Sequence, residues 1–446
     1  METTKMYNIF TSLLAITGRP AAIVAVSLTC LWPCGSAPKG AVPRLPISLA
    51  GRMSCFLDDT PQFNGGTGGC QLATTCACTR TTGYAARDAG LAMYSVALSP
   101  DCRTCAVCWR SFDNDNRWSG VLELWNSLDG QRRRKLKTAA KTFNVLAFSP
   151  DGSMLAITAS STEDYFGSNI LELWNVAEGR LVRTINLRGG LGISLGFSPD
   201  GHTLVVDGPE ETHFLPLDKG RVRTAVVDMW DVTNGKLIRT FRMKSGSVGG
   251  YPKFSPDGET LAIGGVAIPS DFVPAPGSGV GVVELWSIRD GKLIRTLKTA
   301  SHGVMSLAFS PDGKILASSG LNSPDLGAME MWNVSTGTLI NTLHTKDHQI
   351  NKIAYSSDGR MLADLTWNPY NNGLPIGVLE LRNASTGELL ATLNTVDHVD
   401  SITFTPNNEN LIVGAPTQGD TGSDIGIVEV WSTSTFQLLR TLKMTP

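Results

Sequence analysis

Three cysteines at two-residue gaps, Cys102, Cys105 and Cys108, are the most conspicuous group of chemically reactive side chains in the sequence. Thiolates at short spacing can bind a metal ion or join in a disulfide. Successive residues of a β-strand point to opposite faces, so Cys105 and Cys108 would not share one ion if this stretch is a strand. A disulfide or metal site formed with the N-terminal segment stays open. The partners considered for it are Cys70, Cys76 and Cys78.

Three histidines, His302, His348 and His398, form the second candidate group, and Asp347 and Asp397 precede two of them. Imidazole and carboxylate groups together can bind zinc or copper. The histidines fall about one repeat apart in the pattern described below, which is too far apart for one ion. We therefore predict no metal site.

The signatures of common catalytic sites are absent. The sequence has no Cys-x-x-Cys-His haem attachment site, no P-loop and no Gly-x-Ser-x-Gly elbow. The formal net charge is -2, and charged residues make up 17% of the chain, without a basic balance that would favour nucleic acid. The sequence predicts no catalytic residues, no cofactor and no nucleic-acid partner.

The elements that position these residues belong to a repeated unit. From residue 94 onward an apolar run, a Ser-Pro-Asp-Gly turn and a second apolar strand recur, followed by an alternating strand such as VLELWN and a fourth strand such as LIRTL. The turn aspartate, or the asparagine that replaces it, lies at positions 101, 151, 200, 257, 312, 358 and 407. Four strands in each of seven units predict a seven-bladed β-propeller.

These units resemble the WD-repeat family over residues 93–443. The resemblance is carried by the Ser-Pro-Asp-Gly turns and by six tryptophans: Trp125, Trp174, Trp230, Trp286, Trp332 and Trp431. It implies an all-β fold of four-stranded antiparallel blades. Only Trp230-Asp231 completes the Trp-Asp pair, Arg382 replaces the seventh tryptophan, and the family's Gly-His pair is missing. The last unit carries its own fourth strand, so we expect the ring to close by packing of one blade on another.

The sequence divides into three parts. Residues 1–34 are a hydrophobic N-terminal segment whose apolar run resembles the core of a signal peptide. Residues 35–92 form a linker or weakly structured region rich in Gly, Thr and Cys, and residues 93–446 form the propeller. We expect no membrane span beyond the N-terminal signal. An exported and a cytoplasmic location both fit the sequence.

The loops between the second and third strands of the units are long, and no two match. The resemblance places all seven at one rim of the ring, where variable loops on a rigid scaffold commonly bind partners. Their aromatic residues are the predicted partner-binding residues: Phe112, Trp118, Tyr165, Phe166, Phe214, Phe272, Trp367 and Tyr370. The alternative is that these side chains fold back on their own loops.

An acidic residue recurs at one position of the third strand in every unit: Glu123, Glu172, Asp228, Glu284, Glu330, Glu380 and Glu429. Five units carry an arginine on the next strand: Arg134, Arg183, Arg239, Arg295 and Arg440. A ring of carboxylates suggests a cation site, but we expect cross-strand ion pairs instead.

The repeat also explains the three cysteines. Aligned with SPDGSMLAITA of the second unit, Cys102 falls on Gly152 and Cys105 on Leu155. Cys102 must then adopt the left-handed backbone that this turn gives to glycine, at a cost of roughly 1–2 kcal/mol. We predict that the first blade is the least stable.

Together these observations predict a non-catalytic scaffold that binds a protein or peptide through its long-loop rim. One alternative is a propeller-type enzyme, such as a hydrolase, a lyase or a quinone-dependent dehydrogenase, with its site at the mouth of the channel. The other is a purely structural or cell-surface propeller.

Overall fold

A computed structural model describes the chain from residue 91 to residue 444 with short gaps. The described ranges are 91–112, 118–162, 169–188, 194–209, 225–245, 247–267, 279–323, 326–344, 349–368, 376–396, 399, 401–418 and 424–444. The N-terminal parts predicted at 1–34 and 35–92 lie almost wholly outside these ranges and stay predictions.

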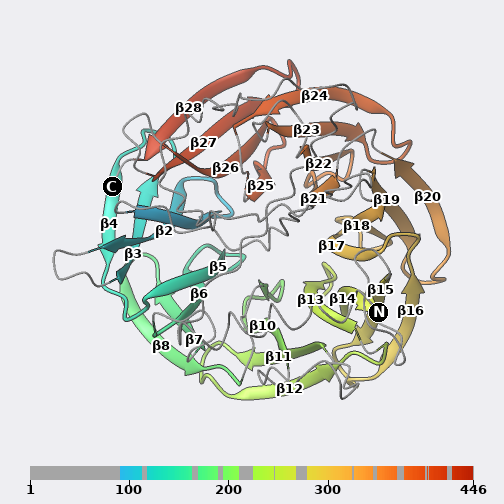
Figure 1. Cartoon of the computed structure of the whole chain (residues 1–446), viewed down its shortest axis with the longest axis horizontal. Coiled ribbons are helices and arrows are strands. Elements are labelled where there is room, and N and C mark those ends of the chain that lie inside the picture. Colours follow the sequence, from blue (N-terminus) through green and yellow to red (C-terminus); the bar gives the residue numbers. More distant parts are fainter. Residues whose placement is uncertain are drawn as a thin grey trace, which may run out of the picture. The chain divides into compact units, whose positions relative to one another are not determined.

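The described residues form seven four-stranded antiparallel sheets arranged in a ring, which confirms the predicted propeller (Figure 1). The first four blades consist of β1 (Leu91–Leu98), β2 (Thr104–Phe112), β3 (Trp118–Asn126) and β4 (Arg132–Leu136); β5 (Thr142–Phe148), β6 (Met154–Ser160), β7 (Asn169–Asn175) and β8 (Arg180–Asn186); β9 (Leu195–Phe197), β10 (Thr203–Pro209), β11 (Ala225–Asp231) and β12 (Leu237–Arg242); and β13 (Ser247–Phe254), β14 (Thr260–Ala267), β15 (Val280–Ser287) and β16 (Leu293–Lys298).

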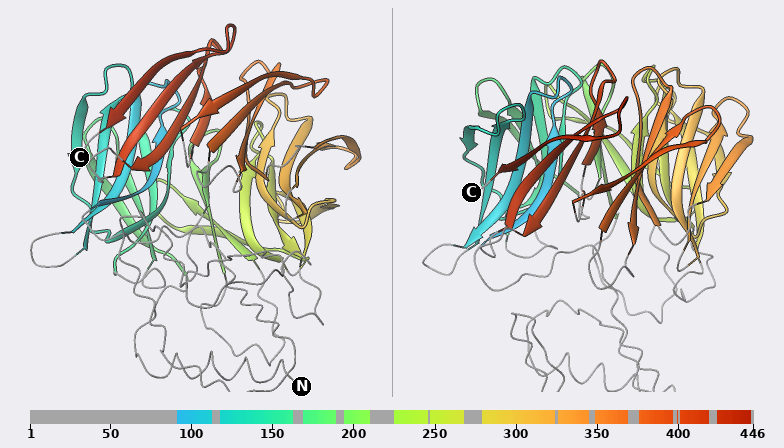
Figure 2. Two further views of the ribbon diagram at one scale, coloured as in Figure 1. Left: turned by 45° about the horizontal axis from the view of Figure 1, so that its top comes forward. Right: turned by 90° about the horizontal axis from the view of Figure 1, so that it is seen from above.

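The last three blades repeat the same order. They consist of β17 (Gly303–Phe309), β18 (Ile315–Ser323), β19 (Leu326–Asn333) and β20 (Leu339–His344); β21 (Gln349–Tyr355), β22 (Met361–Asn368), β23 (Ile376–Asn383) and β24 (Leu389–Thr395); and β25 (Ser401–Phe404), β26 (Asn410–Gln418), β27 (Asp424–Ser432) and β28 (Leu438–Met444). The first strand of each blade lies nearest the centre of the ring and the fourth forms its outer edge (Figures 1 and 2).

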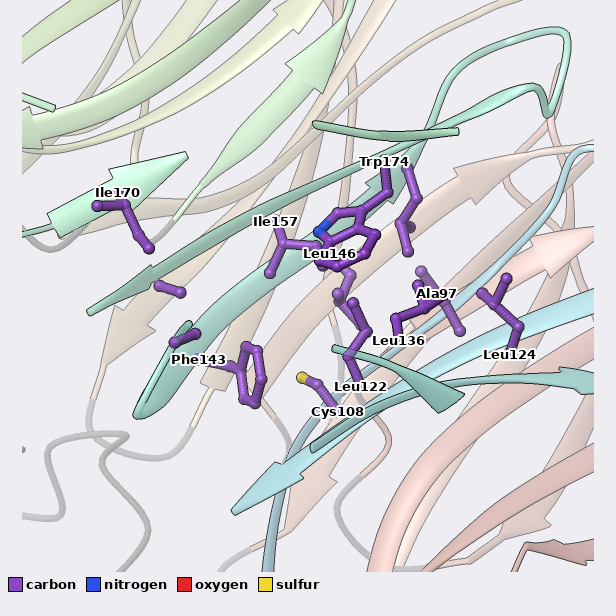
Figure 3. Close-up of a cluster of buried hydrophobic side chains, with 14 residues drawn as sticks. Ala97, Cys108, Leu122, Leu124, Leu136, Phe143, Leu146, Ile157, Ile170 and Trp174 are labelled. Atoms are coloured by element: carbon purple, nitrogen blue, oxygen red, sulfur yellow. The ribbon is translucent and has the colours of Figure 1, made fainter. Parts of the chain in front are cut away.

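The cores lie in the seams between blades. In the seam between the first two blades, Cys108 and Leu122 of one blade pack with Phe143, Ile157 and Trp174 of the next (Figure 3). All five side chains are buried. Both faces of each middle strand are therefore covered by protein, which is why these strands are nearly continuously apolar.

The ring closes as the sequence predicts, because each sheet is made of four consecutive strands and the seventh blade borrows none from the first. Val428 and Met444 of the seventh blade pack with Val107 and Trp125 of the first. The closing seam thus has an apolar core of its own.

The strand prediction for the cysteines is also confirmed. Cys105 packs in the seam with the seventh blade, whereas Cys108 packs in the seam with the second. Cys102 and Cys105 are buried free thiols, and burial raises the pKa of both. A thiol whose pKa is raised carries little thiolate near neutral pH and reacts slowly. Cys70, Cys76 and Cys78 lie outside the described residues.

Candidate functional surface

The strand order gives the ring two different rims. The second strand of each blade ends, and the third begins, at one edge, which we call the long-loop rim. The Ser-Pro-Asp-Gly turns and the turns between the third and fourth strands lie at the opposite edge, which we call the turn rim. The polar groups of the turn rim form hydrogen bonds within the propeller itself.

The polar groups of the turn rim are bound within each turn. In the second blade Ser149 Oγ donates to Asp151 Oδ1 (2.5 Å) and accepts from the backbone N–H of Met154 (2.9 Å). The same pair of contacts recurs in the next blade at Ser198, Asp200 and Thr203. The serine hydroxyl lowers the pKa of Asp151, as expected for a carboxylate that accepts hydrogen bonds. These residues therefore build the turns.

Arginines of the fourth strands also serve the turn rim, each reaching to the following blade. Arg183 Nη2 donates to the backbone carbonyl of Thr233 (2.9 Å), and Arg295 Nη2 donates to that of Ser335 (3.1 Å). Arg239 makes the same contact with Arg289 O at 3.3 Å. Arg134 donates likewise to Glu178 O, and Arg440 donates to Leu128 O. We call these five contacts arginine stitches.

The predicted ion pairs between these arginines and the recurring acids are therefore wrong. The cause is the register of the third and fourth strands. Glu172 pairs with Thr184, whereas Arg183 pairs with Leu173, the residue after the glutamate. Neighbouring residues of a strand point to opposite faces, so acid and arginine lie on opposite faces of the sheet. The register is the same in the other four blades that have the arginine.

Three of the recurring acids instead bind the tryptophan of their own blade, and several bind the linkers between blades. Glu172 accepts a hydrogen bond from Trp174 Nε1 (3.0 Å) and another from Thr138 Oγ1 (2.8 Å). Glu284 accepts from Trp286 Nε1 (3.1 Å) and from the backbone N–H of Ser245 (2.8 Å). Three members do form ion pairs, but with other arginines: Glu123 with Arg132 (3.0 Å), Asp228 with Arg188 (3.4 Å) and Glu380 with Arg382. The ring of acids is structural and faces the seams.

The sixth blade replaces the tryptophan by a buried charged group. Arg382 Nε donates to Asp364 Oδ2 (2.7 Å), and Arg382 Nη2 donates to Glu380. Burial raises the pKa of Asp364, and the Arg382 guanidinium opposes that rise. Asp364 occupies the strand position that holds Ile157 in the second blade, so the acid and the arginine replace two apolar side chains together. A buried cation requires such a partner.

A buried carboxyl that sequence reasoning missed lies between the third and fourth blades. Asp207 Oδ1 accepts from the backbone N–H of Ser194 (2.5 Å), and Oδ2 accepts from that of Gly250 (3.3 Å). Its burial raises the pKa of Asp207 to about 8. Alignment of the repeats could have revealed this residue, because Asp207 is charged at a position that is Thr158 and Gly264 in the neighbouring blades.

Three of the eight predicted partner-binding residues lie within described strands. Phe112 ends β2, Trp118 begins β3, and the two are paired in register. Trp367 lies in β22, where it pairs with Gln349 and Gly377. The other five lie outside the described residues: Tyr165, Phe166, Phe214, Phe272 and Tyr370. The partner-binding role of all eight stays a prediction.

His302 lies in the linker before β17, where its Nδ1 is 3.2 Å from the carbonyl oxygen of Gly279. His348 and His398 lie outside the described residues. Among the residues that the structure describes, no three His, Cys, Asp or Glu side chains gather to hold a metal ion. Within the same residues, no helix has the length and apolar character needed to cross a membrane.

Comparisons with known proteins match parts of this ring. The family described as "WD domain, G-beta repeat" matches residues 291–323, from the turn before β16 to the end of β18. A segment of 89 residues is 32% identical to Mitochondrial division protein 1 of Vanderwaltozyma polyspora. That segment is 19% of this chain and spans 12% of the relative's length.

Proposed function

We propose that this chain is a non-catalytic scaffold that binds a protein or peptide through the long-loop rim. The family match, the partial relative and the seven-bladed ring together support the WD-repeat family for this chain. Propellers of this family typically bind protein partners and are generally not enzymes. The partner is held by surface complementarity with aromatic anchors, because large rigid aromatic side chains supply most of the energy at such interfaces.

The observation that carries the proposal is the contrast between the two rims. On the turn rim the serines, aspartates and arginines repeat from blade to blade and bind one another or the backbone. The connections at the long-loop rim differ in sequence in all seven blades, and most of them also differ in length. A surface that varies on a repeated scaffold is the part of the molecule able to encode a specific partner.

The test is site-specific photocrosslinking. A photoreactive phenylalanine analogue is placed at Trp118 or Trp367, and as a control at Leu128, an apolar side chain of the turn rim that is 56% exposed. We expect the same partner to be crosslinked from both long-loop positions and not from Leu128.

Alanine variants at the same three positions complete the experiment. Trp118→Ala with Trp367→Ala should weaken capture of the crosslinked partner at least tenfold, while Leu128→Ala leaves it unchanged. Crosslinks from Leu128 alone, or capture that is insensitive to both tryptophans, would overturn the proposal and favour a purely structural propeller.

A further inference from the structure

The outer edges of the fifth and sixth blades differ in charge from those of the other five. The fourth strand of each blade forms its outer edge (Figure 1), and within the described residues no further strand pairs with it. Five of these strands carry two or more basic residues: β4, β8, β12, β16 and β28. Strands β20 and β24 carry no lysine, arginine, aspartate or glutamate. The two blades that lack an arginine stitch, with Asn341 and Ala391 at that position, therefore also have uncharged edges.

The charge of an edge strand decides whether it can pair with another chain. An edge strand presents unpaired backbone N–H and C=O groups, which form a template for a further strand. Proteins commonly protect such edges with lysine or other charged side chains, because a new strand would have to bury them. The five basic edges have this protection, whereas β20 and β24 do not. Their composition therefore favours pairing with another strand.

Strand β24 also exposes apolar side chains beside its free backbone groups. Leu389 is 46% exposed and Leu390 is 40% exposed. Leu390 is the extra residue of a bulge against β23, and the same bulge recurs in the outer strands of the other blades. The bulge thus does not distinguish β24 from the protected edges. Beyond it, residues 391–395 pair with β23 in unbroken register, which leaves a regular edge on the outer side.

The same charge pattern points to a second copy of this chain as the occupant. A two-fold axis at an edge pairs a strand with itself, so each cation of the strand lies near the cations of the copy. Like charges in neighbouring strands are destabilising where they lie opposite each other. Because β24 contains no ionisable side chain, it can pair with its own copy in any register without this repulsion. Strand β20 fits less well, since it ends in His344.

From this arrangement we propose that β24 pairs antiparallel with β24 of a second copy of this chain, so that the sixth blades of two rings form one continuous sheet. Backbone hydrogen bonds between the two edges supply the affinity, as in other cases of strand addition to a sheet. The exposed surface of Leu389 and Leu390 is then partly removed from water. The contact lies on the circumference of the ring, and it does not depend on the function proposed for the long-loop rim.

Sedimentation velocity of the full chain over a range of concentrations tests this contact. We expect a reversible equilibrium between monomer and dimer. Thr392 is exposed near the middle of β24, and Thr392→Lys should raise the dissociation constant of the dimer at least tenfold, because it places two cations at the contact. The matched control is Thr296→Lys on β16. Thr296 is also exposed and pairs with Glu284 as Thr392 pairs with Glu380, so this variant should dimerise as the native chain does.

Hydrogen exchange followed by mass spectrometry gives a second readout that needs no substitution. In the native chain the amides of β24 should exchange more slowly as the concentration rises, while those of β16 do not change. A native chain that stays monomeric, or a dimer that a folded Thr392→Lys variant leaves intact, would overturn the proposal. Slow exchange of β24 in a monomeric chain would also overturn it, because another segment of the same chain would then cover the edge. Trp118→Ala should still dimerise, so a failure of the rim proposal leaves this result unaffected.

Discussion

Cys102 occupies, with a φ of 57°, a left-handed turn position that is glycine in five other blades: Gly152, Gly201, Gly258, Gly313 and Gly359. In the seventh blade Asn408 holds it at φ 58°. Asparagine tolerates this conformation better than cysteine does, and Asn408 Oδ1 also accepts a hydrogen bond from the backbone N–H of Ser357 (2.7 Å). The Cys102 thiol is buried and donates only a long hydrogen bond to the backbone carbonyl of Pro100 (3.9 Å).

We therefore expect Cys102→Gly to raise the melting temperature of the propeller. The substitution removes roughly 1–2 kcal/mol of backbone strain and loses part of the packing of one small side chain. Differential scanning calorimetry measures the change. Asn408→Gly is the control, and it should not stabilise because it removes the contact with Ser357. An unchanged or lower melting temperature for Cys102→Gly would show that the buried thiol outweighs the strain.

Asp207 should make the stability of the ring depend on pH. Its pKa of about 8 in the folded chain lies above its ordinary value of 3.8, so between these values the folded chain holds a proton that the unfolded chain has released. Its contribution is therefore complete at low pH and is lost as the pH rises toward 8, by roughly 1.4 kcal/mol for each unit of pKa difference. Asp207→Asn should flatten the fall in melting temperature between about pH 5 and pH 8.

The comparison for that experiment is Asp151→Asn. The pKa of Asp151 is lowered by Ser149, so its contribution is present at neutral pH and is lost as the pH falls. The two variants should change the pH profile in opposite directions. A profile of Asp207→Asn parallel to that of the native chain would contradict the prediction.

At the scale of the strand and the turn, the arginine stitches and the turn glycines form one coupled unit. A Cβ placed on Gly235, which has a φ of +70°, would lie 2.3 Å from Cδ of Arg183. The glycine is thus required both by its backbone and by the arginine of the preceding blade. Between the last two blades the pair is exchanged as a whole: Ala391 replaces the arginine, and Phe436 replaces the glycine at φ 58°. Both then pack at the same apolar cluster.

A double-mutant cycle tests this coupling. Gly235→Ala should destabilise the native chain by more than the ~1 kcal/mol of backbone strain, because it also displaces Arg183. In an Arg183→Ala background only the strain should remain. Urea unfolding gives the free energies.

The control for the cycle is Gly201→Ala, where a Cβ would meet Pro150 only at 3.7 Å. Its cost should be the same with or without Arg183. Additive costs for Gly235→Ala and Arg183→Ala would disprove the coupling.

At the scale of the molecule, the contacts in the seam between the seventh and first blades hold the ring closed. Internal seams join blades that are also joined by the chain, which keeps their local concentration high. The closing seam depends on the packing of Val428 and Met444 against the first blade and on the stitch from Arg440 to Leu128.

Arg440→Ala should therefore destabilise the ring more than Arg183→Ala, although both remove the same kind of contact. Hydrogen exchange followed by mass spectrometry should show faster exchange in β28 and in the turn between β3 and β4. Equal effects of the two variants would mean that the apolar core alone closes the ring.

The repeat predicted the blades and their order because four alternating strands with fixed turn residues allow few other arrangements. It also placed Cys105 and Cys108 in different seams, since residues an odd number of positions apart in a strand point to opposite faces. The direction of Arg183 could not be predicted in this way. A bulge between Leu173 and Trp174 shifts the pairing by one residue and moves the arginine to the other face.

The stitch from Arg440 to Leu128 is the same contact that joins Arg183 to Thr233 within the chain. The polar contact across the seam that no polypeptide connects is therefore of the same kind as the contacts across the connected seams. A circularly permuted chain, opened between β16 and β17 and joined between the seventh and first blades, would retain all seven sheets and all five stitches. The arrangement of the blades in the ring therefore does not depend on which blade comes first in the polypeptide.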